Sequence, residues 1–351
     1  MTSFGQLILF PLLTAFLVTT LSTPVALYFL KKFKVMDDPK KHKHPAIIHK
    51  IPIPRGGGIP MYIGVLIASL LFLPMSKIVI ALFIASFLAL CIGVLDDKKD
   101  LSPYLRFVIN IVCALIVVWG GANIPFITNP FGGILFLSSI HIPYLSYLIA
   151  IIWVVWVMNM LNWSKGIDGQ MPGVVAISAV IIGILSLRFP TLDIYTHISA
   201  TLSFIIAGSA LGFLIFNFYP AKIFPGYGAT AIYLLLAVVS ILSSAKLATA
   251  ILVMGVPMID GMFTIGRRIL TGHSPFRHDK RHLHHLLLDI GFGQRRIALF
   301  YWTLSAILGS LSLFLSSRGK LFAILMLIII VGGVLLSLQF ITRKENDKTY
   351  L

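Results

Sequence analysis

Residues 76–100 read SKIVIALFIASFLALCIGVLDDKKD. Between Lys77 and Asp96 this stretch carries no charged residue, and it has the length and apolarity of a membrane-spanning helix. The predicted helix covers 78–95 and ends at two adjacent carboxylates, Asp96 and Asp97. The chain therefore joins a lipid-embedded segment to acidic side chains at the membrane–water boundary.

The whole sequence has the composition of a multi-spanning membrane protein. Of its 351 residues, 58% are hydrophobic and 11% are charged, whereas a soluble domain is typically about 25% charged. Such a chain needs lipid as its solvent, and in lipid a helix satisfies its own backbone hydrogen bonds. No long polar stretch could form a second domain, so we expect one transmembrane domain over 1–351. Cys91 and Cys113 lie in apolar runs and match no disulfide or metal pattern.

Eleven apolar runs are long enough, or nearly long enough, to span a bilayer. They lie near 5–30, 58–76, 78–95, 105–120, 143–161, 172–188, 195–216, 229–244, 247–266, 297–316 and 321–342. They predict an all-α polytopic fold with an uncharged loop at 121–142.

The distribution of charge predicts the orientation of the chain. The net charge is +16, and one side of the eleven-span arrangement holds nearly all the basic residues. The exceptions are Lys77, Arg188, Lys246, Arg318 and Lys320. The positive-inside rule therefore predicts an N-terminus outside and a C-terminus inside, and it accounts for the basic charge without nucleic acid. Of the twelve acids, only Asp193 lies outside, and Asp260 lies within a span. Because topology does not require acids, their gathering indicates chemistry at the inner face.

The paired carboxylates Asp96 and Asp97 are the first candidate site. Two neighbouring anions raise each other's proton affinity unless a cation lies between them. Mg²⁺ prefers a few carboxylates together with substrate phosphate oxygens. The pair therefore suits either a metal anchor or a general base.

Three further inner loops carry candidate residues for an anionic substrate. The loop 31–57 offers His49 and Arg55 next to three glycines, which let a backbone approach a phosphate closely. The loop 162–170 and the end of the preceding span offer Asn159, Asn162, Lys165 and Asp168. The loop 217–228 offers Asn217 and Lys222. Solvated basic loops and simple turns are the alternative interpretation of these segments.

The loop 267–296 is the richest in ionisable residues. It contains Arg281, His282, His284 and His285, and Asp260 precedes it late in an apolar span, where an ionisable group is a functional candidate. Zinc is one interpretation of the histidines. A cation-dense loop suits a diphosphate better than a second dication, because His and Arg donate charge-assisted hydrogen bonds to phosphate oxygens. A topology signal alone would account for the Arg and Lys residues but not for H-L-H-H.

Taken together, the loops resemble the polyprenyl-phosphate N-acetylhexosamine-1-phosphate transferase family, from about Asp37 to Arg296. Asp96 and Asp97 match its paired aspartates, and residues 217–224 match its N-F-x-P-A-K-x-F run. Its N-A-x-N-x-x-D-G-x-D-G pattern is matched at Asn159, Asn162, Gly166, Asp168 and Gly169. Pro257 and Asp260 match its P-x-x-D. His282, His284 and His285 match its H-x-H-H, which resembles the UDP-GlcNAc-type branch more than the lipid I translocase.

The resemblance implies a function. Members transfer a sugar-1-phosphate from a UDP-sugar to a polyprenyl phosphate such as undecaprenyl phosphate, release UMP, and start the synthesis of cell-envelope glycans. They work on the cytoplasmic side of the inner membrane with Mg²⁺ (Mn²⁺ is an alternative), and relatives suggest a homodimer. The resemblance implies Asp96, Asp97 and Asp168 as catalytic and metal-binding residues. Its substrate-binding residues would be Asn159, Asn162, Lys165, Asn217, Lys222, Arg281, His282, His284, His285, His49 and Arg55.

The sequence departs from the family pattern at two acidic positions. Lys165 stands at the first aspartate of D-G-x-D-G, and Tyr227 stands at the aspartate of G-D-x-G-S, a metal ligand in the family. One hypothesis is that the Lys165 ammonium replaces part of the metal's charge neutralisation. Another is a catalytically impaired homologue that binds carrier lipid or scaffolds a glycan-assembly complex. A secondary transporter would need charges near the middle of the membrane, and only Asp260 approaches that position.

Overall fold

The computed structural model describes residues 5–40, 48–129, 132–188, 193–242, 247–276 and 281–348, with side chains as far as 341. It is mostly helical. The helices are η1 (Gly5–Leu9), α1 (Phe10–Lys32), α2 (Gly58–Phe72), α3 (Lys77–Lys99), α4 (Pro103–Trp119), η2 (Leu137–Ile140), α5 (Leu145–Trp163), α6 (Gln170–Leu187), α7 (Ile194–Asn217), η3 (Tyr227–Ala229), α8 (Thr230–Leu242), α9 (Leu247–Val253), α10 (Gly255–Leu270), α11 (Leu283–Asp289), α12 (Gln294–Ser312) and α13 (Ser317–Lys348). Each of the eleven expected apolar segments coincides with one of these helices or with the α9–α10 pair.

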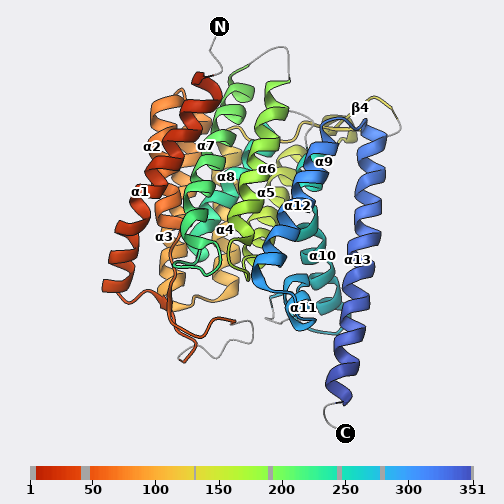
Figure 1. Cartoon of the computed structure of the whole chain (residues 1–351). Coiled ribbons are helices and arrows are strands. Elements are labelled where there is room, and N and C mark those ends of the chain that lie inside the picture. Colours follow the sequence, from red (N-terminus) through yellow and green to blue (C-terminus); the bar gives the residue numbers. More distant parts are fainter. Residues whose placement is uncertain are drawn as a thin grey trace.

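The long helices run side by side as one bundle (Figure 1). Six of them are long and apolar enough to cross a membrane, namely α1 with η1, α3, α5, α6, α7 and α13, and the bent pair α9–α10 would be a seventh. The helices α2, α4 and α8 are apolar but shorter. The start of α1 and the end of α13 lie at opposite ends of the bundle (Figure 1). These features make the chain a polytopic membrane protein.

The ninth expected segment is not one straight helix. Within 247–266 the structure breaks at Met254, and the axes of α9 and α10 are bent by 85°. Pro257 supplies the physical reason, because proline has no backbone N–H and its ring clashes with the carbonyl four residues earlier. Beyond the break, α10 carries Asp260, which accepts hydrogen bonds from the start of α11.

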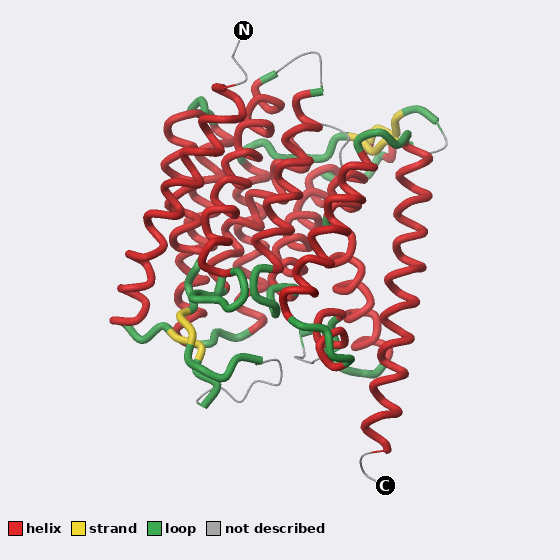
Figure 2. Tube along the Cα trace, in the orientation of Figure 1, coloured by secondary structure: helices red, strands yellow, loops and turns green. Residues whose placement is uncertain are grey.

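Four short strands modify the predicted all-α class. Strand β1 (Met36–Asp37) pairs antiparallel with β2 (Ile53–Pro54), and β3 (Phe126–Thr128) pairs antiparallel with β4 (Ile134–Phe136). The second pair forms a hairpin within the predicted uncharged loop 121–142. The first pair lies at the other end of the bundle, among the loops that follow α1, α3 and α7 (Figure 2). We call this end the site end.

The core is built around α8, all of whose residues are buried. Some polar side chains in the core form hydrogen bonds between helices. Trp153 Nε1 in α5 donates to the Ser240 hydroxyl of α8 at 2.9 Å, and the Thr19 hydroxyl of α1 donates to that of Ser209 in α7 at 3.1 Å. Buried polar groups without partners are costly in an apolar environment, so these bonds fix the mutual positions of the helices.

Close packing of glycines places the turn that precedes α8 at the site end. Gly226 has a φ of +67°, a conformation that glycine adopts without steric cost. The following turn, η3, rests on α2 and α3 where each presents a glycine. A Cβ atom on Gly58 would lie 2.2 Å from the backbone of Gly228, and one on Gly93 would lie 2.4 Å from it. The backbone of η3 can therefore approach the last turn of α3, which carries Asp96 and Asp97.

Candidate active site

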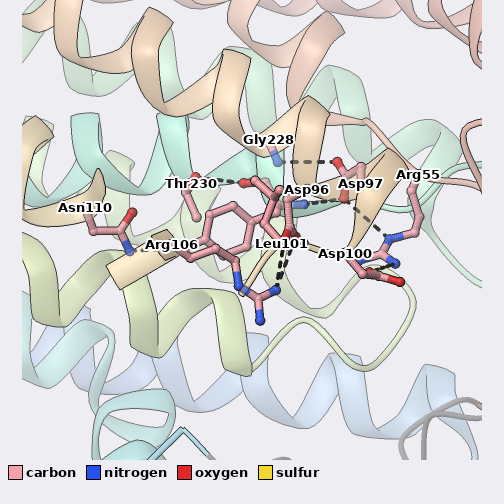
Figure 3. Close-up of polar contacts among 10 residues, drawn as sticks. Arg55, Asp96, Asp97, Asp100, Leu101, Arg106, Asn110, Gly228 and Thr230 are labelled. Atoms are coloured by element: carbon pink, nitrogen blue, oxygen red, sulfur yellow. Dashed lines mark hydrogen bonds and ion pairs between the residues drawn. The ribbon is translucent and has the colours of Figure 1, made fainter. Parts of the chain in front are cut away.

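Asp97, at the end of α3, is buried and held by the turn before α8. Its Oδ1 accepts the backbone N–H of Tyr227 at 2.8 Å, and Gly228 N lies 3.5 Å from Oδ2. Arg55 Nε lies 3.4 Å from Oδ1. A Cβ atom on Gly226 would lie 2.1 Å from Oδ2, so only glycine leaves room for the carboxylate there. Figure 3 shows Asp97 between Arg55 and Gly228.

Asp96 is fully buried and faces a different set of partners. Arg106 Nη1 lies 3.3 Å from Oδ1 and 3.2 Å from Oδ2. The helix ends at Asp100, which adopts the left-handed conformation with φ 46°. This reversal brings the backbone N–H of Leu101 to 2.9 Å from Asp96 Oδ1. The two adjacent carboxylates therefore each have their own arginine, which removes most of their mutual repulsion.

The Tyr227 side chain lies in this same group of charges. Arg106 is 5.3 Å and Lys165 Nζ is 5.6 Å from the centroid of its ring, both within cation–π range. Asn110 Nδ2 donates to its hydroxyl at 3.1 Å. We call Arg55, Asp96, Asp97, Arg106, Lys165 and Tyr227 the ion cluster.

The pKa values of Arg55 and Lys165, the two basic residues that loops contribute to the ion cluster, shift in opposite directions. Burial lowers the pKa of Lys165 to about 8, although Asp97 acts in the opposite direction. For Arg55, burial also opposes the charge, but the nearby carboxylates, Asp97 foremost, outweigh it and raise the pKa. Lys165 therefore loses its charge at a lower pH than an ordinary lysine does.

Asp168 lies in a second group of contacts, on the loop between α5 and α6. Its Oδ2 accepts the backbone N–H of Ala221 at 2.9 Å. Asn217 Oδ1 accepts the N–H of Gly169 at 3.0 Å, and Asn217 Nδ2 donates to the carbonyl of Ile223 at 2.8 Å. These bonds join the loop 164–169 to the loop after α7. Burial raises the pKa of Asp168.

The histidines form a third group, built on α10 and α11. His282 Nδ1 lies 2.8 Å from Asp260 Oδ2, and Asp260 Oδ1 accepts the backbone N–H of Leu283 at 3.0 Å. The rings of His282 and His284 stack with centroids 5.7 Å apart, and His285 lies 4.3 Å from His284. Burial, reinforced by the two neighbouring histidines, lowers the pKa of His284 well below its ordinary value.

The loop 164–169 connects the three groups. Lys165 belongs to the ion cluster and Asp168 to the second group. A Cβ atom on Gly166 would lie 2.3 Å from His284 Nε2, so this loop also contacts the histidines. Segments widely separated in the sequence therefore meet at one end of the bundle.

The other predicted residues have different surroundings. Asn159 Nδ2 donates to the carbonyl of Val155 in its own helix at 2.8 Å. Asn162 Oδ1 is buried without a hydrogen-bond partner. Lys222 and Arg281 are exposed. His49 Nε2 lies 3.2 Å from the carbonyl oxygen of Asp37, and its ring contacts Phe224. Residues 277–280, part of the predicted loop 267–296, lie outside the described residues.

The predicted Mg²⁺ can be compared with the residues available to hold it. Asp96 and Asp97 already accept hydrogen bonds and ion pairs from Arg106, Arg55 and backbone N–H groups. Asp168 accepts from Ala221, in a separate group. Within the described residues, no three His, Cys, Asp or Glu side chains form a group that could hold a metal ion. Mg²⁺ is usually held by one or two carboxylates together with substrate phosphate oxygens and water. The oxygens of Asp96 and Asp97 would first have to give up their present donors, so the donor set does not fit Mg²⁺ as it stands. The Mg²⁺ of the sequence analysis stays a prediction.

Sequence reasoning missed three residues at the site, and it singled out a fourth, Asp260, without predicting its partner. Arg106 pairs with Asp96, Asn110 with Tyr227 and Asp260 with His282, and the Gln294 side chain accepts the backbone N–H of Asp168 at 3.3 Å. The basic Arg106 just beyond a carboxylate pair and the acid Asp260 within an apolar span were available signals. Nothing in the local sequence marks Asn110 or Gln294.

Helices that carry a buried carboxylate pair, ringed by basic side chains at one end, define a membrane protein built to handle an anionic group. The sequence profile of glycosyl transferase family 4 matches residues 79–244. The "Probable undecaprenyl-phosphate N-acetylglucosaminyl 1-phosphate transferase" of Bacillus subtilis is 30% identical over 91% of this chain and 89% of its own length. The chain belongs to glycosyl transferase family 4, and it is a transferase.

Two further relatives show the breadth of the similarity. The decaprenyl-phosphate N-acetylglucosaminephosphotransferase of Mycobacterium leprae is 29% identical over 95% of this chain and 90% of its own length. The phospho-N-acetylmuramoyl-pentapeptide-transferase of Moorella thermoacetica is 28% identical over 87% of this chain and 97% of its own length. The resemblance to a sugar-1-phosphate transferase family noted in the sequence is therefore confirmed.

Proposed function

We propose that the protein transfers N-acetylglucosamine-1-phosphate from UDP-GlcNAc to a polyprenyl phosphate such as undecaprenyl phosphate, and so starts a cell-envelope glycan. The observation that carries this proposal is the similarity, over nine-tenths of the chain or more, to relatives named for this transfer to undecaprenyl and decaprenyl phosphate. The basic and histidine-rich groups at the site end support it, because both substrates present phosphate there.

The reaction exchanges one phosphoanhydride for another. An oxygen of the polyprenyl phosphate attacks the β-phosphorus of the UDP-sugar in line, and the bond from that phosphorus to the bridging oxygen breaks. UMP leaves with the bridging oxygen, and the product is a polyprenyl diphosphate sugar. Such a transfer requires mainly positioning and charge neutralisation from the protein.

The residues of the site supply those two contributions. Arg55, Lys165 and Arg106 bring positive charge to the phosphates, and Asp96 and Asp97 fix the two arginines. Asp168 fixes the loop that carries Lys165. Other residues supply the remaining contacts. The diphosphate is bound by His282, His284, His285 and Arg281, and the nucleotide by Asn159 and Asn162. The lipid phosphate, or the loop that holds it, is contacted by His49, Asn217 and Lys222.

The proposal also includes the orientation of the protein in the membrane. All eleven apolar segments cross or enter the bilayer, with the N-terminus outside and the C-terminus inside. The site end then faces the cytoplasm at the inner membrane, where UDP-sugars are available, and the lipid reaches it sideways from the inner leaflet. A homodimer is the proposed assembly, to be tested by the mass of the detergent-solubilised protein.

The transfer is tested directly with purified full-length protein. A panel of UDP-sugars, each labelled in the sugar, is incubated with undecaprenyl phosphate, and label in the lipid phase is counted. We expect UDP-GlcNAc to give labelled lipid and released UMP in equal amounts. Labelled lipid from none of the sugars would refute the transferase proposal and favour a lipid-binding homologue.

A further inference from the structure

The oxygens of the two buried carboxylates at the site already have donors within the fold. Asp97 Oδ1 has the Tyr227 N–H at 2.8 Å and Arg55 Nε at 3.4 Å. Asp97 Oδ2 faces Gly226 and the Gly228 amide. Asp96 has Arg106 on both oxygens and the Leu101 N–H on one. A dication would have to displace these donors, which would leave the partly buried guanidinium groups of Arg55 and Arg106 without their carboxylates, at a cost in stability.

The charge of the ion cluster also disfavours a dication. Arg55, Arg106 and Lys165 bring three positive charges to the two buried carboxylates. A third carboxylate, Asp100, lies 3.5 Å from Arg55 Nη1, but its side chain is 52% exposed and its charge is more strongly screened by solvent. Lys165 lies close enough to both arginines and both carboxylates for their charges to act on its ammonium. Added positive charge would be repelled in this partly desolvated environment, whereas a phosphate group would be attracted.

Tyr227 contacts two of the basic side chains. Its ring has Arg106 at 5.3 Å and Lys165 Nζ at 5.6 Å from its centroid, and aromatic faces attract cations in this range. Its hydroxyl accepts from Asn110. The phenol of Tyr227 supplies no carboxylate ligand for a metal. Its ring instead stabilises two positive side chains, Arg106 and Lys165, near Asp96 and Asp97.

We propose that the ammonium of Lys165, held beside Asp97 with Arg55 and Arg106, neutralises the substrate diphosphate, so that this transferase works without a divalent cation. The inference rests on the proposed transfer, and it identifies the side chains whose positive charge neutralises the phosphates in that reaction. A lysine ammonium is a compact point charge on a flexible stem, and it binds phosphate in that form in other phosphate sites. The pairing of Lys165 with Tyr227 accounts for both departures from the family's acidic pattern.

The first measurement compares transfer of labelled sugar-1-phosphate to undecaprenyl phosphate in excess chelator and in excess Mg²⁺. The wild-type rate is expected to agree within about twofold between the two conditions, a difference of about 0.4 kcal/mol in the barrier. A rate that vanishes with chelator and returns with Mg²⁺ would overturn the inference while leaving the proposed function intact.

The second measurement does not depend on turnover. Binding of Mn²⁺ to the full-length protein is followed by the loss of the free-ion electron paramagnetic resonance signal. Wild type is expected to bind no stoichiometric Mn²⁺, and Lys165→Asp combined with Tyr227→Asp is expected to gain one site. Lys98→Asp, an exposed charge reversal at the end of α3, is the matched control and should gain none. Stoichiometric Mn²⁺ binding by wild type that disappears in Asp97→Asn would overturn the inference even if no sugar were transferred.

Discussion

His282 Nδ1 lies 2.8 Å from Asp260 Oδ2, and this bond joins the N-cap of α11 to the first half of α10. The same carboxylate also accepts the backbone N–H of Leu283. Asp260 thereby fixes both the ring of His282 and the start of the helix that carries His284 and His285. It is a positioning residue for the histidine group.

Asp260→Asn is therefore expected to slow transfer more than it destabilises the protein. The amide keeps one acceptor oxygen but loses the charge that orients His282. A hydrogen bond to a charged group contributes about 1.5–3 kcal/mol, so we expect roughly a 10- to 100-fold loss of kcat/KM. The measurement is steady-state transfer kinetics at several UDP-GlcNAc concentrations, with Asp289→Asn, an exposed acid in α11, as the control. A normal rate in Asp260→Asn would show that His282 needs no carboxylate partner.

Asp97→Asn should reduce turnover by at least about 10²-fold, the lower range for a positioned catalytic group. The substitution weakens the ion pair with Arg55 while leaving an oxygen to accept the Tyr227 N–H. The loss should appear as a lower kcat in purified protein whose thermal transition remains cooperative. An unchanged kcat would remove this carboxylate from the mechanism.

Lys165 predicts opposite effects of pH on function and on stability. Its pKa of about 8 lies below the ordinary value of 10.5. Phosphate binding needs the protonated amine, so affinity for UDP-GlcNAc should fall as pH rises through about 8. Between pH 8 and 10.5 the unfolded state binds more protons than the folded state at this group, so its contribution to the free energy of unfolding rises with pH.

Titration calorimetry with UDP-GlcNAc between pH 8 and 10.5 tests whether the affinity falls as pH rises. Thermal unfolding over the same range tests whether the stability rises. Lys165→Arg keeps the positive charge at all these pH values and should lose the decline in affinity. A decline that persists in Lys165→Arg would assign the titration to another group.

The helical fold was predictable because the bilayer imposes it. Every apolar segment, such as 78–95, must satisfy its backbone internally, so length and hydropathy were enough to place the helices. The break at Met254 was not placed, although Pro257 was visible, because a proline can end a helix or only kink it, and packing decides between them. Sequence alone could not give that packing.

The site was predictable in its residue types but not in its pairings. Asp96 and Asp97 stood out as acids that topology does not require, and Lys165 and Tyr227 stood out against a family pattern. Their partners come from distant segments. The bond from Asn110 to Tyr227 spans 117 residues of chain, and only tertiary packing creates it. The spacing of residues along the sequence does not indicate such contacts.

Gly93→Ala tests the close approach of α3 to the turn before α8. The new Cβ would lie 2.4 Å from the backbone of Gly228, so the turn must move, and with it the amide that binds Asp97. Overpacking of this kind costs typically about 1–3 kcal/mol. We expect a lower thermal midpoint and slower transfer. Gly333→Ala in α13 has open space around its Cβ and should stabilise the helix by about 0.5–1 kcal/mol. Equal effects of the two substitutions would argue against this contact.

Tyr227→Phe separates the hydroxyl of Tyr227 from its ring. Loss of the hydroxyl leaves Asn110 Nδ2 buried without its partner, which costs about 1–3 kcal/mol. The ring keeps its contacts with Arg106 and Lys165, so the cations stay in place and transfer should remain within about tenfold of wild type. Tyr227→Ala removes the ring as well, and we expect it to lose both stability and transfer. Thermal midpoints and initial rates of the two variants are compared in the same detergent. If Tyr227→Phe kept its thermal midpoint but lost transfer, the hydroxyl would act on the substrate rather than hold the ion cluster together.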